Sequence, residues 1–222
     1  RKGGAMQKLS QIGIIFIFSG FVKAIDPLGS AYKFTDYFIA FQIDWLSPAA
    51  VFFSVLLAAL EFTIGFALVN NALTKLASIA MFAFMSFFTI LTFYIALANP
   101  VSDCGCFGDA LILSNWQTFY KNLIIMIPAS LVLLQRKKYV PRFMKGGQIF
   151  IIAFGMLLSL FLSKHSYNHL PPIDFRPYKI GTNIGLAKND QLEGAPLPEF
   201  KTTIVYEKNG EKKEFDINNL PD

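Results

Sequence analysis

Long runs of apolar residues, separated by short polar links, dominate the chain up to residue 162. Five of these runs approach the roughly 20 residues that an α-helix needs to cross the hydrocarbon core of a membrane. Runs 48–69 and 76–98 are clearly long enough, whereas 9–25, 119–134 and 147–162 lie nearer the lower limit of about 17 residues. The pattern predicts a bundle of five membrane-spanning helices.

The link at 26–47 is predicted to be more than a plain loop. Aromatic residues alternate there with charged and polar ones, as in Tyr32-Lys33-Phe34 and Asp44-Trp45. This texture is typical of an amphipathic helix that lies in the membrane interface with its rings at headgroup depth. Two interpretations stay open, namely ordinary packing in the aromatic belt and a lid over a site on the same membrane face.

The last sixty or so residues have a different, mixed polar texture. Prolines at 171, 172 and 177 disfavour helix and predict an extended stretch. From Glu199 onwards apolar and polar residues alternate on both sides of Asn209-Gly210, which predicts a β-hairpin. Because a lone hairpin is marginally stable in water, we expect it to begin a larger domain that continues past Asp222. We also expect a few residues to precede Arg1.

Composition agrees with a membrane protein. The chain is 54% hydrophobic and contains 24 phenylalanines, and its mean hydropathy is +0.45. These values are too apolar for a soluble domain of this length. The net charge of +5 comes from basic residues beside the predicted spans, where membrane topology explains them, so no nucleic-acid partner is expected.

The distribution of Lys and Arg predicts the orientation. Basic residues precede the first span, follow the second at Lys75, and crowd the link after the fourth at 136–145. The links on the other side carry only Lys33 and, between 99 and 117, nothing basic. By the positive-inside rule the amino terminus is cytoplasmic, which puts the carboxyl tail and the link at 99–117 outside.

The chain has only two cysteines, and a single glycine separates Cys104 from Cys106 in that outer link. Disulfides persist in extracytoplasmic compartments, and residues i and i+2 can meet the required Cα separation in a bent loop. So small a ring is expected to be strained and easily reduced, and it would stabilise the fold little. These arguments favour a redox-active pair over a passive disulfide, idle thiols or metal ligands.

Other polar residues give weaker indications. Asp103 and Asp109 flank the pair and are expected to raise the thiol pKa values, which disfavours the thiolate. His165 and His169 lie four residues apart and could complete a zinc site with the cysteines. The tight Cys-x-Cys spacing and the prolines beyond His169 favour histidines that anchor at the interface instead, so we expect no metal.

Glu61 lies near the middle of the second predicted span, where an ionisable group is costly and usually faces the bundle interior or a wet cavity. It could handle protons, contact a quinone-like ligand, or form a structural hydrogen bond with Ser19, Ser86 or Thr89. Lys23 or Lys121, near the outer ends of their spans, could instead pair with it.

Several segments together resemble the DoxX-like membrane proteins. Gly20-Phe21-Val22-Lys23 closes the first predicted helix, and Glu61-Phe62-Thr63-Ile64-Gly65 lies in the second. The run Asp103-Cys104-Gly105-Cys106-Phe107-Gly108 is similar to the redox-associated MauE branch. The resemblance covers about residues 8–135 and implies a four-helix transmembrane core. The predicted fold is thus an all-α membrane bundle of this kind, with a fifth transmembrane helix and a partial extracytoplasmic β segment.

The resemblance implies electron traffic between extracytoplasmic thiols and quinone or sulfur chemistry. Cys104 and Cys106 match the family's dithiol, and Glu61 matches its second-helix glutamate. A second cysteine pair that could relay electrons is missing, so a direct quinone contact or thiols in a further domain would have to replace it. The expected partners are the lipid bilayer and extracytoplasmic thiol or thioredoxin-like proteins.

The working hypothesis is a bacterial inner-membrane thiol–disulfide oxidoreductase with a periplasmic dithiol and a periplasmic tail. It divides into a core at 8–135, a cytoplasmic link with the fifth helix at 136–163, and a tail at 164–222. The alternative hypothesis is a non-catalytic membrane subunit that docks a larger envelope or secretion complex.

Overall fold

The computed structural model describes residues 2–101, 104–111, 113–175, 203–208 and 211–216. The chain divides into two compact units, Arg1–Arg176 and Pro177–Asp222. The first is helical and the second contains a pair of strands, and each is described by itself.

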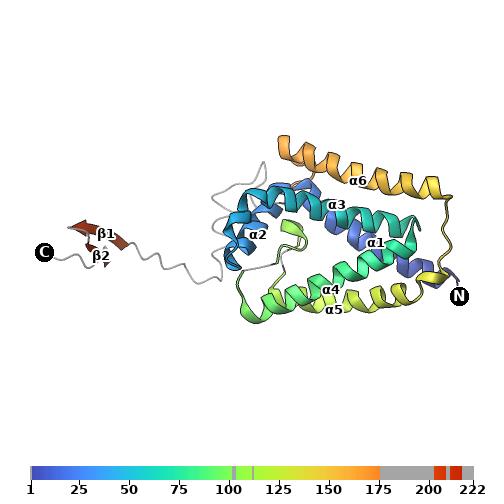
Figure 1. Ribbon diagram of the computed structural model, residues 1–222, viewed down its shortest axis with the longest axis horizontal. Coiled ribbons are helices and arrows are strands. Elements are labelled where there is room, and N and C mark those ends of the chain that lie inside the picture. The colour runs from blue at the N-terminus through green and yellow to red at the C-terminus, as the bar shows by residue number, and fades with distance from the viewer. Residues whose placement is uncertain (1, 102–103, 112, 176–202, 209–210, 217–222) are drawn as a thin grey trace. The chain divides into compact units, whose positions relative to one another are not determined.

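The long helices of the first unit lie lengthwise beside one another (Figure 1). Three 3₁₀-helices, labelled η, also occur among the described residues. In chain order the elements are α1 (Lys2–Ile25), α2 (Pro27–Ala40), η1 (Asp44–Ala49), α3 (Ala50–Val69), α4 (Thr74–Ala98), η2 (Gly108–Ala110), α5 (Asn115–Leu134), η3 (Arg136–Lys138) and α6 (Lys145–Asn168). Helix α1 packs mainly on α3, α4 on α5, and α6 on α3 and α1.

The predicted membrane spans are confirmed with shifted ends. In the part of the chain that the structure describes, four helical segments are long and apolar enough to cross a membrane: Asp44–Val69, Thr74–Ala98, Asn115–Lys138 and Lys145–Asn168. The fifth passes the same test only as a pair, Leu9–Ile25 with Pro27–Ala40, which is bent by 94°. The bend follows from local chemistry, since the Asp26 side chain caps α2 by accepting a hydrogen bond from the Gly29 N–H and Pro27 occupies the first turn.

Two helices extend beyond the ends of their hydrophobic runs, because the polar residues that flank those runs also suit a helix. Helix α5 begins at Asn115 rather than residue 119, because Ser114 and Gln117 form a capping box. Helix α6 continues to Asn168 rather than ending at residue 162, with Ser163 and Ser166 buried along it. The polar residues that end a hydrophobic run therefore do not end the helix itself.

Glycines let α1 and α3 approach closely. A Cβ atom added to Gly65 would lie 2.6 Å from both the Gly13 carbonyl oxygen and the Ile17 nitrogen. A Cβ on Gly20 would lie 2.5 Å from the Phe62 nitrogen. Small residues at such contacts are how membrane helices gain packing without a hydrophobic driving force.

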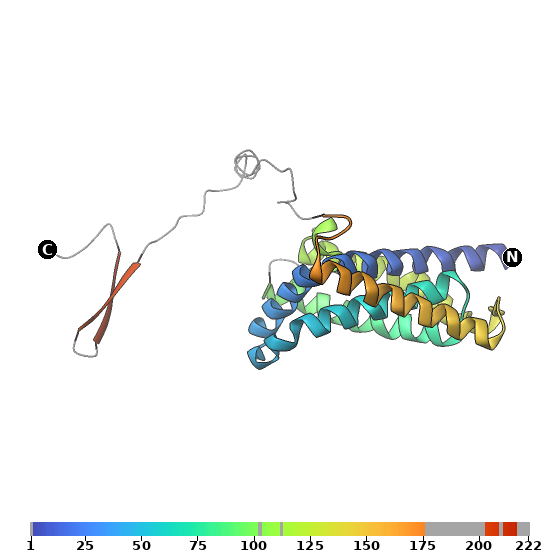
Figure 2. The same ribbon diagram turned by 90° about the horizontal axis from the view of Figure 1, so that it is seen from above.

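The helical unit has two distinct ends. At one end Asn71 donates a hydrogen bond to the Val140 carbonyl at 2.5 Å, and Gln148 accepts one from the Leu73 N–H at 2.9 Å. These contacts join the α3–α4 link to the α5–α6 link and to the start of α6, at the end where α1 begins (Figures 1 and 2). Lys75 in the first turn of α4 and the basic residues at 136–145 lie at the same end. Helix α2 and the cysteine loop lie at the opposite end.

The second unit contains the predicted hairpin. Strands β1 (Thr203–Lys208) and β2 (Glu211–Asp216) pair antiparallel, with Thr203 opposite Asp216 and Lys208 opposite Glu211. The expected turn residues Asn209 and Gly210, and the start of the alternation at Glu199, lie outside the described residues.

We predict that Gly65→Ala destabilises the helical unit by about 1–3 kcal/mol, since the added methyl group meets backbone atoms that cannot move independently. Gly146→Ala is the matched control, because a Cβ atom there would meet nothing within 4 Å and alanine favours a helix. Thermal unfolding in detergent would measure both. Equal melting temperatures for the two variants would contradict the close packing of α1 on α3.

Candidate functional site

Cys104 and Cys106 form a disulfide with their Cα atoms 5.5 Å apart, within the usual range for such bonds. Gly105 between them has φ = +61°, a left-handed conformation that glycine adopts without strain. A Cβ atom there would also lie 2.8 Å from Cγ of Lys33 on α2. The glycine is thus needed both for the bend and for the close approach of α2.

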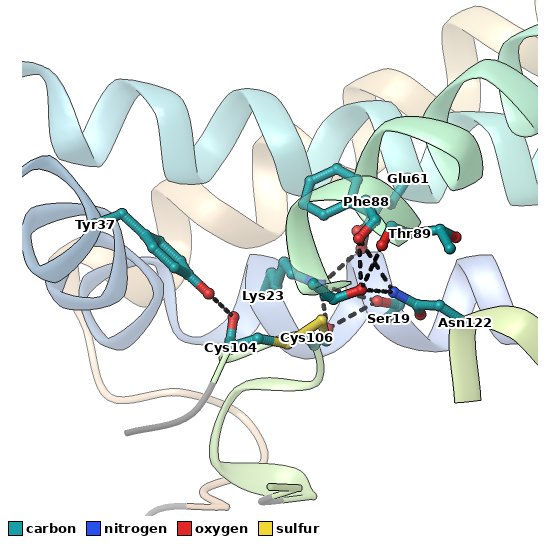
Figure 3. The surroundings of a disulfide bond; sticks show 10 residues. Ser19, Lys23, Tyr37, Glu61, Phe88, Thr89, Cys104, Cys106 and Asn122 are labelled. Carbon is teal, nitrogen blue, oxygen red and sulfur yellow. Dashed lines mark hydrogen bonds and ion pairs between the residues drawn. A yellow bond between two sulfur atoms is a disulfide. The ribbon is translucent and has the colours of Figure 1, made fainter. Parts of the chain in front are cut away.

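A buried ion pair lies directly beside the disulfide (Figure 3). The Lys23 ammonium donates hydrogen bonds to Oε2 of Glu61 at 2.9 Å, to Oγ of Ser19 at 2.9 Å, and to the Cys106 carbonyl. These contacts use all three of its donors. Lys23 is 4% exposed and Glu61 5% exposed, so both charges are shielded from solvent.

This arrangement identifies the partner of Glu61. Of the partners that the sequence suggested, Lys23 forms a salt bridge with it. A carboxylate inside a membrane helix needs such a countercharge, because burying an isolated ion costs several kcal/mol. Lys121 contacts the Phe107 ring instead, with its ammonium 4.3 Å from the ring centroid.

The cysteine loop is held from two sides through its carbonyl oxygens. Ser19 on α1 donates to the Cys106 carbonyl at 3.0 Å, and Tyr37 on α2 donates to the Cys104 carbonyl at 3.0 Å (Figure 3). The interfacial segment expected at 26–47 is thus α2 followed by η1, and α2 contacts the loop directly. Cys104 and Cys106 remain only partly buried under these contacts.

An apolar cavity of about 260 Å³ adjoins the disulfide. Side chains of α1, α2, α3, α4 and α5 line it together with Cys104, Cys106 and Phe107. Most of the lining is aliphatic or aromatic, including Phe84, Phe88 and Leu91 of α4. Its few polar members include Lys23, Glu61, Ser30, Lys121 and Asn122, so it combines an apolar interior with a small charged region.

The structure places three lysines beside the cysteines, a proximity that the sequence analysis did not predict. Lys23, Lys33 and Lys121 come from three different helices and all line the same cavity as the cysteines. Positive charge near a cysteine favours its thiolate. Asp103 and the side chain of Asp109, which were expected to act in the opposite direction, lie outside the described residues. The signal in the sequence that could have pointed to these cations was the placement of lysines within apolar runs.

The two histidines do not join this site. The His165 and His169 rings stack with centroids 4.9 Å apart at the end of α6, and neither lines the cavity. Within the described ranges, no group of three or more His, Cys, Asp or Glu side chains is arranged to hold a metal ion.

The fold and the site define a multi-pass membrane protein with a disulfide at one end of its bundle. The family model described as "Methylamine utilisation protein MauE" matches residues 9–135, more than half of the chain. The chain therefore belongs to the MauE family. A model described as "Domain of unknown function (DUF8463)" matches residues 200–222. No curated protein and no solved structure gives a significant match.

We predict that Lys23→Met or Glu61→Met alone destabilises the bundle by about 3–5 kcal/mol, because each leaves one buried charge without its partner. The double variant should recover most of this loss, since two apolar residues of similar size need no countercharge. Chemical unfolding of the four proteins in detergent gives the coupling energy. Additive losses in the double variant would contradict the ion pair.

We further predict that Tyr37→Phe speeds reduction of the disulfide by up to about tenfold, because a hydrogen bond worth about 0.5–1.5 kcal/mol no longer holds the loop against α2. Tyr32→Phe is the control, since Tyr32 lies on the same helix and is 70% exposed. Rates with a small thiol reductant, followed by alkylation of the released thiols, would compare them. An unchanged rate for Tyr37→Phe would show that α2 does not restrict the loop.

Proposed function

We propose that this protein is a membrane thiol–disulfide oxidoreductase that exchanges its Cys104–Cys106 disulfide with thiols of an extracytoplasmic partner. The observation that carries the proposal is the position of the disulfide. It lies at one end of a membrane bundle, only partly buried, on a loop whose carbonyl oxygens accept hydrogen bonds from α1 and α2. A disulfide that closes a ring this small adds little stability through chain entropy, which favours a chemical role over a stabilising one.

The exchange follows ordinary thiol–disulfide chemistry. A partner thiolate attacks one sulfur, a mixed disulfide forms, and the released cysteine leaves as a thiolate. The partner's second thiol then resolves the mixed disulfide. In total the partner dithiol loses two electrons and two protons, its new S–S bond replaces Cys104–Cys106, and this chain keeps two thiols. Reduction of a partner disulfide is the same sequence in reverse.

The surrounding charges support this chemistry. Lys121 and Lys33 line the cavity beside the pair and would stabilise the thiolate that leaves. Glu61 acts through Lys23, whose ammonium contacts the Cys106 carbonyl, so we assign Glu61 a positioning role. The cysteines are the residues that react.

The proposed location is the inner membrane of a bacterium, with the amino terminus cytoplasmic. The support is the gathering of the basic links at the end of the bundle opposite the disulfide (Figure 1). The cysteine loop and the carboxyl tail would then face the periplasm, where disulfides persist. Thioredoxin-like proteins are the expected class of partner.

One observation favours the alternative of a non-catalytic subunit of a larger envelope complex. Tyr32 on α2 and Trp45 on η1 are 70% and 77% exposed near the disulfide end. Exposed aromatic residues suit either a membrane interface or a protein contact. Under this alternative the disulfide would only shape the loop that α2 contacts.

Thiol trapping separates the two functions. In cells that express Cys104→Ser or Cys106→Ser, we expect one variant to accumulate a mixed disulfide with an oxidised partner, because its remaining thiolate attacks the partner disulfide and the cysteine of this chain that would resolve the adduct is gone. The double variant is the control and should trap nothing. Non-reducing gels and mass spectrometry would identify the adduct. Failure of both single variants to trap a partner, with a wild-type pair that never changes redox state, would favour the structural subunit.

A further inference from the structure

The two cysteines of the disulfide have different surroundings (Figure 3). The Cys106 carbonyl accepts hydrogen bonds from the Lys23 ammonium and from the Ser19 hydroxyl, both on α1. The Cys104 carbonyl accepts one from the uncharged phenol of Tyr37 on α2, at 3.0 Å. The pair is therefore asymmetric, with a cation on the Cys106 side and a neutral donor on the Cys104 side.

Cys106 is also the cysteine from which the chain continues into the bundle. Phe107, the next residue, is buried, and its ring packs against that of Phe18 on α1 with the centroids 5.9 Å apart. The Gly108 N–H donates a hydrogen bond to the Gly105 carbonyl at 3.0 Å. Cys106 and Phe107 are the two central residues of the turn that this bond closes. These contacts hold the Cys106 backbone in place when the S–S bond opens.

A second cation lies on the same side of the pair. The Lys121 ammonium of α5 lies 4.3 Å from the centroid of the Phe107 ring. The Lys33 side chain lies against Gly105, between the two cysteines, so that contact favours neither of them. Positive charge near a sulfur stabilises its thiolate, and the sulfur that forms the more stable thiolate is the better leaving group. The charges around this disulfide thus favour Cys106 as the sulfur that is released.

We propose that a partner thiolate attacks the sulfur of Cys104 and that Cys106 leaves as the thiolate, beside Lys23 and Lys121. The bond that forms joins the partner sulfur to Cys104, and the bond that breaks is Cys104–Cys106. The electron pair of the broken bond stays on the Cys106 sulfur, which then takes up the proton that the partner thiol lost. When the second thiol of the partner displaces Cys104, a second proton passes to this chain in the same way. This inference rests on the proposed function and gives each cysteine a separate role.

The same roles apply when the exchange runs in the opposite direction. The Cys104 thiolate attacks the disulfide of an oxidised partner, and Cys106 then resolves the mixed disulfide. A partner is therefore joined to Cys104 in both directions, whereas Cys106 forms a bond only with Cys104. Lys23 contacts the Cys106 carbonyl rather than its sulfur, so it is a positioning residue for this step.

Oxidised wild-type protein in nanodiscs tests the assignment directly, with glutathione as the probe thiol. A brief reaction would be stopped with acid, the released thiol blocked with N-ethylmaleimide, and the adducts located by tandem mass spectrometry. We expect glutathione on Cys104 with the maleimide on Cys106 to exceed the opposite pattern by at least about tenfold. Equal amounts of the two patterns, or glutathione mainly on Cys106, overturn the inference.

The contribution of the Lys23 ammonium is measured with the double variant Lys23→Met and Glu61→Met, which removes the ion pair without leaving an unpaired charge. We expect the ratio of the two adducts to fall by at least about threefold, a change that a loss of stability alone does not produce. Lys164→Met is the control and should keep the wild-type ratio, because Lys164 is exposed and does not line the cavity. An unchanged ratio in the double variant overturns the electrostatic basis of the assignment.

Trapping in cells separates this inference from the proposed function. Cys106→Ser should accumulate the mixed disulfide with an oxidised partner, because Cys104 attacks and no thiol of this chain resolves the adduct, whereas Cys104→Ser should accumulate little. Melting temperatures confirm that each variant is folded. A partner trapped equally by both variants, or mainly by Cys104→Ser, overturns the assignment and leaves the exchange intact. Failure of both variants to trap a partner counts against the exchange itself, even where glutathione marks Cys104.

Discussion

The buried ion pair between Lys23 and Glu61 is the interaction on which the arrangement of the site depends. Two charges inside a membrane bundle are tolerated only when they meet, and their meeting fixes α1 against α3 at one register. The glycine contacts of Gly20 and Gly65 bring the two backbones close enough for that contact. The same ammonium also donates to the Cys106 carbonyl, so the ion pair holds the cysteine loop in place as well.

Around this pair, each helix contributes a different part of the site. Helix α2 leaves α1 through the bend at Asp26 and contacts the cysteine loop through Tyr37 and Lys33. Helices α4 and α5 supply the apolar side of the cavity and the additional cation of Lys121. The disulfide is thus bounded by a polar cluster on one side and by membrane-depth aromatic residues on the other.

Membership of the MauE family agrees with this arrangement, and the matched region, residues 9–135, contains every residue assigned a role in the site. Helix α6 lies beyond the match, yet it packs on α3 and α1 and supports the helices that carry the ion pair. Gly155 allows this contact, since a Cβ there would lie 2.9 Å from the Phe66 ring. The hairpin of the second unit lies in the tail, part of which matches a separate family of unknown function.

The sequence by itself determined the spans and the hairpin and singled out Cys104, Cys106 and Glu61 as candidate site residues, because hydrophobic run length, alternation and rare residue types are local properties. It predicted helix ends less well, since the length of a hydrophobic run does not register the Ser114–Gln117 capping box and the burial of Ser163 depends on contacts between helices. Only the tertiary structure selected Lys23 among the possible partners of Glu61 and brought Lys33 and Lys121 to the cysteines. Those choices depend on helix rotation and packing between segments far apart in the chain, which no local pattern encodes.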